Sequence, residues 1–242
     1  MKIFLKFFIL FSLLYLTFYL VPFSNFKPDE EFYKSEDKLW MHRMLDPNNN
    51  DNSKEFPGYE LDVFFNKVDR IFEVRHHGEE FKYTLDSYFS EFKSMDGKFF
   101  WIDFKNLDSV NMNESLSQLT KVVEKYNIKG NIIVESKEID VLIKFKNNNF
   151  AISYWLPDFH FFGVLTSSFI VRSNIIKYRP TALSCDFNSL HFYLKKFPNY
   201  TFHCWVNNLN SKGDQDLIRE LSRNTNINII LTDFKNNFLI NH

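Results

Sequence analysis

Short apolar runs rich in β-branched and aromatic residues alternate with helix-like segments along most of the 242-residue chain, and this alternation is what most limits its fold. One of the helix-like segments, 115–126, places Leu116, Leu119, Val122 and Val123 on a single face. Strands that alternate with helices are typical of a parallel sheet or barrel, so we expect an α/β fold. The expected strands are 38–42, 59–64, 71–76, 99–103, 131–134, 150–154, 182–185, 200–206 and 227–231.

The spacing of these runs indicates which strand is not part of the repeat. A parallel connection needs about a dozen residues or more, yet only about six separate the second run from the third. We therefore expect those two to form an antiparallel hairpin that folds back near 66–69 and returns His76 to the level of Glu60. The other eight runs fit a (β/α)8 barrel of the TIM type. Such barrels carry their chemistry at the C-terminal ends of the strands.

The N-terminus is predicted to be a membrane segment. Residues 7–26 carry no charge, and about twenty apolar residues are enough for a helix to cross the hydrocarbon core. Lys2 and Lys6 precede this stretch, which favours a cytoplasmic N-terminus and an extracytoplasmic barrel. Because no small-residue cleavage site follows, we expect an uncleaved signal anchor, a transmembrane helix at 1–26, then a linker at 27–36 and the barrel at 37–242. A cleaved secretory signal is the alternative.

Charge and cysteine content exclude some classes of protein. The formal net charge is −1, whereas nucleic-acid binders usually show a basic face, so no nucleic-acid partner is expected. The two cysteines, Cys185 and Cys204, are expected to be half-buried free thiols, with a disulfide as the alternative in an oxidising compartment.

Acidic residues gather at the expected strand ends. Glu60 and Asp62 are two residues apart in one strand, so their carboxylates point to the same face. Asp103 ends the next barrel strand, and three carboxylates together suit Mg²⁺ or Ca²⁺. Lys105 shares a face with Asp103 and would lie where a phosphate oxygen could bind. Each pair alone is more often a solvated strand face.

Histidines at the same strand ends supply groups that titrate near neutral pH. His42 and His76 are the expected proton carriers, since cleavage of a phosphodiester needs one group to accept a proton and another to donate one. His77 competes with His76, and we prefer His76 because it shares a strand face with Val74. Arg43 could bind a phosphate oxygen. An isolated histidine is more often structural.

The order of these motifs resembles the glycerophosphodiester phosphodiesterases and the wider phosphatidylinositol-phospholipase-C-like barrels. The similar segments are His42-Arg43, E-L-D-V at 60–63, a hairpin returning to a histidine, D-F-K at 103–105, C-W-V-N at 204–207 and I-L-T-D at 230–233. Thr84-Leu85-Asp86 is similar to the segment that begins the family's next helix. The resemblance covers about residues 38–236.

The resemblance implies a metal-dependent phosphodiesterase in which a hydroxyl of the substrate's own alcohol attacks the phosphorus. It implies a general acid/base pair, a set of ligands for a divalent metal and two phosphate-binding cations. These are His42 and His76; Glu60, Asp62 and Asp103; and Arg43 and Lys105, respectively.

Four departures from the family pattern leave an alternative open, and one of them is Asp46-Pro47-Asn48-Asn49-Asn50 in place of the family's proline-glutamate-asparagine motif. Met44 follows His42-Arg43 where the family has glycine, Asp103 replaces a glutamate, and His77 replaces an aspartate. A non-catalytic barrel that acts as a binding or scaffold protein is therefore one alternative. A lyase that cyclises the phosphate without hydrolysing it would share every residue named, and it is a second alternative.

Two tryptophans extend the expected site. Trp155 and Trp205 lie near predicted strand ends and, with His77, would line a substrate pocket. An aromatic face there would attract a choline-like cation. Core packing is the alternative for both rings. The expected partners are a small phosphodiester or lipid-derived substrate and, through the N-terminal helix, a membrane.

Overall fold

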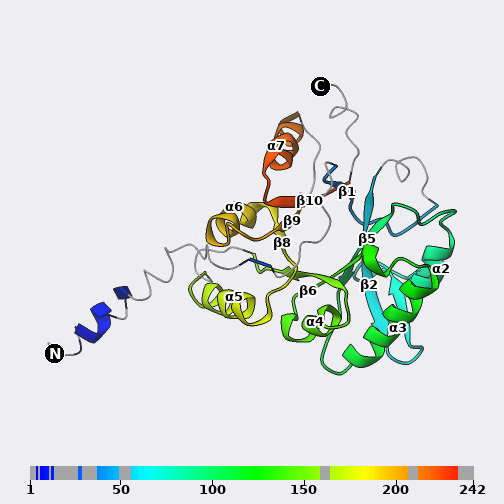
Figure 1. Cartoon of the computed structure of the whole chain (residues 1–242), viewed down its shortest axis with the longest axis horizontal. Helices are drawn as coiled ribbons and strands as arrows, with labels where there is room; N and C mark the ends of the chain where they lie inside the picture. The colour runs from blue at the N-terminus through cyan, green and yellow to red at the C-terminus, as the bar shows by residue number, and fades with distance from the viewer. Residues whose placement is uncertain are drawn as a thin grey trace.

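Eight parallel strands of the described chain close into a barrel in the computed structural model (Figure 1). The structure describes residues 4, 6–10, 12–13, 27–28, 37–48, 56–158, 164–206 and 212–233. β1 pairs with β10 on one side and with β2 on the other, which closes the ring. The barrel strands are β1 (Leu39–Met41), β2 (Gly58–Asn66), β5 (Phe99–Phe104), β6 (Ile132–Ser136), β7 (Ala151–Trp155), β8 (Ala182–Asp186), β9 (Phe202–Trp205) and β10 (Ile227–Thr232).

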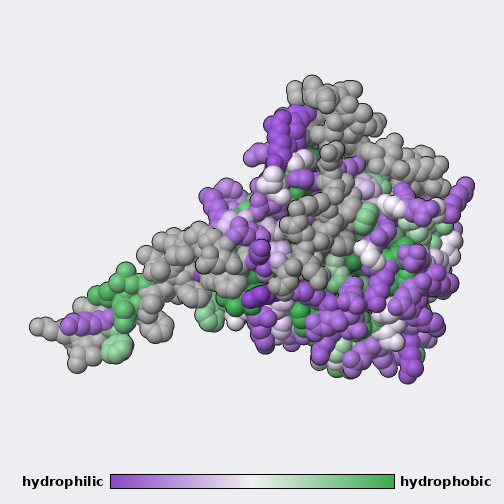
Figure 2. All heavy atoms as spheres, in the orientation of Figure 1, coloured by the Kyte–Doolittle hydropathy of each residue, from purple (hydrophilic) through white to green (hydrophobic). Residues whose placement is uncertain are grey.

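Helices cover the outside of this barrel, and Figure 1 shows them arranged around the strands. The amphipathic segment of the sequence becomes α3, which buries Leu119, Val122 and Val123. Figure 2 shows that the exposed surface over α3 and α7 is largely hydrophilic. The helices are α2 (Leu85–Ser90), α3 (Met112–Lys125), α4 (Ile139–Lys146), α5 (Val164–Tyr178), α6 (Phe187–Lys196) and α7 (Lys212–Arg223), with a 3-10 turn at η1 (Lys129–Asn131).

The hairpin predicted after the second barrel strand is confirmed. β3 (Ile71–Val74) runs antiparallel to β2, with Asn66 opposite Ile71 at the turn. β4 (Tyr83–Thr84) pairs with β3 and was not predicted from the sequence. The expected strand 71–76 ends two residues early, so His76 and His77 lie in the loop that follows. α2 then begins at Leu85, and the hydroxyl of its N-cap residue, Thr84, accepts a hydrogen bond from the backbone N–H of Ser87.

Two apolar cores hold the barrel. The larger lies between the strands and the helices, and the smaller fills the barrel interior around Trp40, Trp101, Ile133, Ile229 and Leu231. The interior is crowded at its N-terminal end, where a Cβ atom on Gly58 would lie 2.2 Å from the Trp40 ring. Large rings therefore close the bottom of the barrel, and the polar side chains lie at its other end.

The remaining expectations concern the N-terminus and the cysteines. No helix among the described residues is long and apolar enough to cross a membrane. The expected anchor at 1–26 and the linker at 27–36 lie mostly outside the described residues. Cys185 and Cys204 are register neighbours on β8 and β9. Both are buried free thiols, as expected, and are more fully enclosed than half-buried side chains.

Candidate active site at the C-terminal end of the barrel

A cavity of about 200 Å³ opens at the C-terminal ends of the strands. All seven residues expected to act in proton transfer, metal binding or phosphate binding line it. The lining side chains are His42, Arg43, Glu60, Asp62, His76, Asp103, Lys105, Glu135, Trp155, Trp205 and Leu231.

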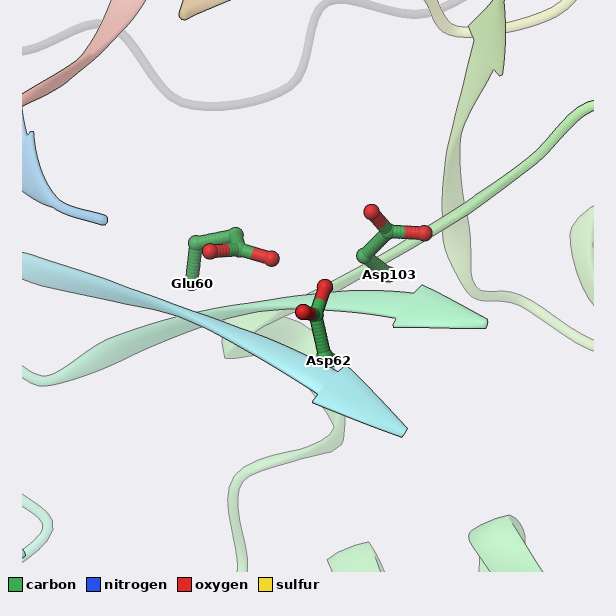
Figure 3. A group of neighbouring side chains, drawn as sticks. All are labelled: Glu60, Asp62 and Asp103. Carbon is green, nitrogen blue, oxygen red and sulfur yellow. The ribbon is translucent and has the colours of Figure 1, made fainter. Parts of the chain in front are cut away.

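Three buried carboxylates form the floor of this cavity. Glu60 and Asp62 come from β2, and Asp103 lies beside Asp62 in register on β5. Figure 3 shows the three carboxylates directed into a shared space. One oxygen of each lies within 4.8 Å of the others. Like charges this close repel each other, so the cluster needs cations to hold it together.

Lys105 is the cation that the chain itself supplies. Its Nζ lies 2.7 Å from Asp62 Oδ1 and also binds Asp103. Burial raises the pKa of the Glu60 carboxyl well above its usual value, and the charge of Asp62 adds to this. Burial likewise raises the pKa of Asp103 to about 6, against the opposing effect of Lys105. Burial also acts to raise the pKa of Asp62, but Lys105 and His76 outweigh it, and that pKa is lowered.

Each of the two histidines is oriented by an aspartate. His42 Nδ1 lies 2.9 Å from Asp233 Oδ1, and His76 Nδ1 binds Asp62 Oδ2. In both rings this leaves Nε2 for proton transfer; in His42 that atom is 4.0 Å from Glu60 Oε2. The hydrogen bond from His42 also lowers the pKa of Asp233. The hairpin thus brings His76 to the carboxylates, with Asp62 rather than Glu60 as its direct partner.

Arg43 contributes through its backbone as well as its side chain. Its φ of 50° is left-handed, a conformation that L-residues other than glycine seldom adopt. In this conformation its N–H donates a 2.7 Å hydrogen bond to Glu60 Oε2. The residue is exposed and lines the cavity, so its guanidinium remains available to an anion.

Of the three residues expected in a substrate pocket, two line the cavity and one does not. His77 is not among the side chains that line the cavity; it is exposed and stacks on Phe64 at a centroid separation of 6.1 Å. Because β3 ends at Val74, strand alternation does not extend to His77. Trp155 and Trp205 do line the cavity and meet edge to face, with centroids 5.3 Å apart.

Comparison with known proteins rests on structure alone. No family model of protein sequences matches the chain, and no curated protein matches it. Several solved structures do. A glycerophosphodiester phosphodiesterase from Parabacteroides distasonis is 14% identical with a TM-score of 0.59, over 83% of this chain and 94% of that one. One from Agrobacterium tumefaciens is 12% identical with a TM-score of 0.54, over 81% and 96%.

A third neighbour is a phosphodiesterase from Oleispira antarctica in complex with the product sn-glycerol-3-phosphate. It is 11% identical with a TM-score of 0.55, and the match covers 81% of this chain and 93% of that one. The chain has the fold of the glycerophosphodiester phosphodiesterases. At these identities the likeness establishes the fold, and the activity has to be argued from the site.

Within the glycerophosphodiester phosphodiesterase fold, the departures noted in the sequence are compatible with the cluster. Asp103 is one methylene shorter than the glutamate expected there, yet its carboxylate still lies within 4.8 Å of the Glu60 and Asp62 ligand atoms. Met44, in place of glycine, is buried, and its backbone N–H donates a 2.9 Å hydrogen bond to the Glu60 carbonyl.

Glu135 and Asp233 are parts of the site that were not predicted from the sequence. Glu135 lies on β6 and is 2% exposed; its Oε2 accepts a 3.0 Å hydrogen bond from Trp101 Nε1. Burial raises the pKa of Glu135 well above its usual value, and the charge of Asp103 adds to this. For Glu135 the signal in the sequence was a single acid within the apolar run I-I-V-E-S, whereas Asp233 ends the family-like segment I-L-T-D.

The donor set suits a hard divalent cation. Glu60, Asp62 and Asp103 supply only carboxylate oxygens, which Mg²⁺ and Ca²⁺ prefer. The buried Asp103 Oδ1 has no hydrogen-bond partner among the described residues, so one acceptor in the cluster is left for a ligand. A divalent ion held there would offset the repulsion that Lys105 offsets only in part.

Proposed function

We propose that the chain is a metal-dependent phosphodiester hydrolase that acts on glycerophosphodiesters or related lipid head-group diesters. One observation carries this proposal: two histidines, each oriented at Nδ1 by an aspartate, face one cavity that also holds three carboxylates and a lysine. Acid–base catalysis needs oriented groups whose pKa lies near neutrality, and phosphoryl chemistry needs positive charge around the phosphate.

The cations of the site bind and orient the phosphate. A divalent ion on Glu60, Asp62 and Asp103 would act as a Lewis acid on a phosphate oxygen. Lys105 lies against the same carboxylates and can share its ammonium group with a second oxygen. Arg43, two residues after the end of β1, also lines the cavity and can bind a phosphate oxygen with its guanidinium. Together these groups stabilise the charge that develops as the P–O bonds change.

The two histidines transfer the protons. One accepts the proton of the substrate hydroxyl next to the phosphoester, and that oxygen forms a new bond to phosphorus. The bond from phosphorus to the leaving alcohol breaks, and the other histidine donates a proton to the departing oxygen. Hydrolysis of the resulting cyclic phosphate by water would then run the same two proton transfers in reverse. His42 and His76 fit either role, because each has Nε2 left for the exchange.

Trp155, on the wall of the cavity, limits which substrate alcohols can bind beside it. Trp155 is contacted by two ammonium groups, Lys137 Nζ at 3.9 Å and Lys105 Nζ at 5.1 Å from its ring centroid. A choline-like cation on this ring would meet both positive charges. The geometry therefore favours a neutral or anionic alcohol over a quaternary amine beside Trp155. The sn-glycerol-3-phosphate bound by the Oleispira antarctica phosphodiesterase supports a glycerol phosphate as the other half.

We further propose that the barrel lies outside the cytoplasm, held by an uncleaved signal anchor. The support is the uncharged run at 7–26 after Lys2 and Lys6. Alkaline extraction of membranes from cells that express the chain tests this proposal. Release of the full-length chain into the soluble fraction would contradict it.

The activity is tested on the full-length chain with a panel of glycerophosphodiesters, in Ca²⁺, in Mg²⁺ and in EDTA. Phosphorus NMR of the products separates hydrolysis from release of a cyclic phosphate. We expect metal-dependent turnover that His42→Gln, His76→Gln and Asp62→Asn each abolish, while His191→Gln, at an exposed helical position, behaves as wild type. Absence of turnover with every substrate and metal would favour a non-catalytic barrel.

A further inference from the structure

Glu135 is a fourth buried carboxylate beside the three-carboxylate cluster. On β6 it is the register neighbour of Asp103 on β5, and paired parallel strands lie about 4.8 Å apart. Its side chain lines the same cavity as Glu60, Asp62 and Asp103. Of its two oxygens, Oε2 is held by Trp101 Nε1 at 3.0 Å.

The other oxygen of Glu135 is buried and makes no hydrogen bond of normal geometry with a described residue. The hydroxyl of Ser184 lies near enough to favour the charged form, but it does not complete such a bond. A buried carboxylate without partners is costly, and structural acids in cores usually have both oxygens satisfied. The arrangement fixes one oxygen against the barrel wall and leaves the other for a ligand in the cavity.

We propose that Glu135 is a fourth carboxylate of the cation site, acting on the ion directly or through a bound water, and that it makes the site prefer Ca²⁺ to Mg²⁺. This inference rests on the cation binding of the proposed function. Ca²⁺ takes six to eight oxygen ligands in flexible geometry, whereas Mg²⁺ keeps several of its waters and uses one or two carboxylates. A fourth acidic group therefore benefits Ca²⁺ more.

Trp101 is the positioning residue of this carboxylate. Its ring is fully buried in the barrel interior, and Nε1 is directed at Glu135 Oε2. Partners of this kind, which orient a ligand without touching the ion, typically change metal affinity about 10- to 100-fold when they are removed.

Calorimetric titration of the metal-free full-length chain with Ca²⁺ and with Mg²⁺ tests the proposal without any substrate. Glu135→Gln keeps an acceptor for Trp101 and removes only the charge. We expect it to weaken Ca²⁺ binding about 10- to 100-fold and Mg²⁺ binding by less. The matched control is Glu138→Gln, three residues along the same segment; that side chain is exposed and is not among those that line the cavity. It should bind both ions as wild type does.

Four outcomes would overturn the proposal or part of it. If Glu135→Gln binds Ca²⁺ with wild-type affinity, Glu135 is not a fourth ligand. If Glu138→Gln loses as much Ca²⁺ affinity as Glu135→Gln, the effect is one of general surface charge. If Glu135→Gln loses equal affinity for Ca²⁺ and Mg²⁺, Glu135 does not make the site prefer Ca²⁺. A wild-type chain that binds neither ion would overturn the whole inference. Thermal unfolding in EDTA shows whether Glu135→Gln is folded. A chain that binds Ca²⁺ but cleaves no diester would refute the proposed function and leave the role of Glu135 in place.

Discussion

At the scale of single residues, Arg43 shows how a local conformational cost supports the site. A left-handed residue with a side chain costs roughly 1–2 kcal/mol, and Arg43, with φ of 50°, has this conformation. In return its N–H lies 2.7 Å from Glu60 Oε2 and fixes one carboxylate of the cluster. Its backbone and guanidinium therefore have separate roles, and a glycine at this position distinguishes them.

Arg43→Gly should keep the backbone hydrogen bond and lose the guanidinium. We expect kcat/KM for a glycerophosphodiester to fall about 10- to 100-fold, the size of one lost charge-assisted hydrogen bond. The free energy of unfolding in urea should change by no more than about 1 kcal/mol, because relief of backbone strain in the folded state offsets the greater conformational freedom of the unfolded chain.

Arg70→Gly is the matched control for this substitution. Arg70 has a φ of 55° at the exposed tip of the hairpin, where its guanidinium lies 3.7 Å from Glu114. It should show the same small change in stability and unaltered kinetics. Equal losses of activity in both variants would refute a phosphate-binding role for Arg43.

His203 gives a second prediction, on stability. It is fully buried, with Ser153 Oγ 3.2 Å from Nδ1, and burial lowers its pKa to about 3. In the unfolded chain a histidine titrates near 6.5, so below that pH the unfolded state binds the extra proton. The stability that the buried neutral His203 contributes is therefore fully present above about pH 6.5 and is lost as the pH falls toward 3.

Urea unfolding of wild type and His203→Gln at pH 7 and pH 5 measures this effect. The difference in unfolding free energy between the two proteins should shrink by about 2 kcal/mol over that interval, since one pKa unit corresponds to about 1.4 kcal/mol. His191→Gln, on the surface of α6, should follow wild type at both pH values. A difference independent of pH would mean that His203 is protonated equally in both states.

These residues also show what the sequence could predict. Glu60 and Asp62 were predictable because strand alternation puts residues two apart on one face. Glu135 was missed because one acid within an apolar run gives no such pattern, and its role depends on Trp101 of a neighbouring strand. His77 was a possible pocket residue because alternation could not settle which of the two histidines faces inward; β3 ends at Val74, and His77 is not among the residues that line the cavity.

At the scale of elements, the loop after β6 and the end of β7 form one side of the pocket. Lys137 extends from that loop over Trp155, the last residue of β7. Burial raises the pKa of Asp103, and the charge of Lys137 opposes that rise, after the larger opposing effect of Lys105. The aromatic surface expected to attract a cation is therefore already contacted by ammonium groups of the chain. The sequence could not show this, because it does not fix which way a loop lysine points.

We expect glycerophosphocholine to be a poorer substrate than glycerophosphoglycerol. Lys137→Gln should narrow the difference in kcat/KM about two- to fivefold, since exposed cation–π and ionic contacts contribute about 0.5–1 kcal/mol. Lys144→Gln, at an exposed position on α4, should leave the ratio unchanged. A choline substrate preferred by wild type, or a ratio that Lys137→Gln does not move, would contradict this account of the pocket wall.

The length of the connections between strands was the feature of the sequence that best predicted how the strands pair. The short link between β2 and β3 required an antiparallel pair, and the structure has one. β4 went unnoticed because a strand of two residues, Tyr83–Thr84, has no detectable alternation. Its importance lies in the start of α2, where Thr84 closes a capping box with Ser87.

At the scale of the whole molecule, closure of the barrel assembles the site. β1 pairs with β10, and this brings Asp233 to His42 across 191 residues of sequence. Parallel pairing of β2 with β5 sets Asp62 beside Asp103. The acidic cluster therefore exists only in the folded chain, so a cation that binds it also stabilises the fold.

Removal of the cation should lower the stability of the whole barrel. A ligand that binds only the folded state adds about 2.7 kcal/mol at 100 times its Kd. For a chain of this size, that corresponds to a rise in Tm of roughly 5–10 °C. Scanning calorimetry with Ca²⁺ and then with excess EDTA should show this shift and its reversal.

In Asp62→Asn the Tm should not respond to Ca²⁺, whereas Asp96→Asn, at an exposed turn, should respond as wild type does. The same Tm for wild type in Ca²⁺ and in EDTA would mean that groups of the chain itself, such as Lys105, hold the carboxylates together without an ion, and it would refute the metal-dependent mechanism.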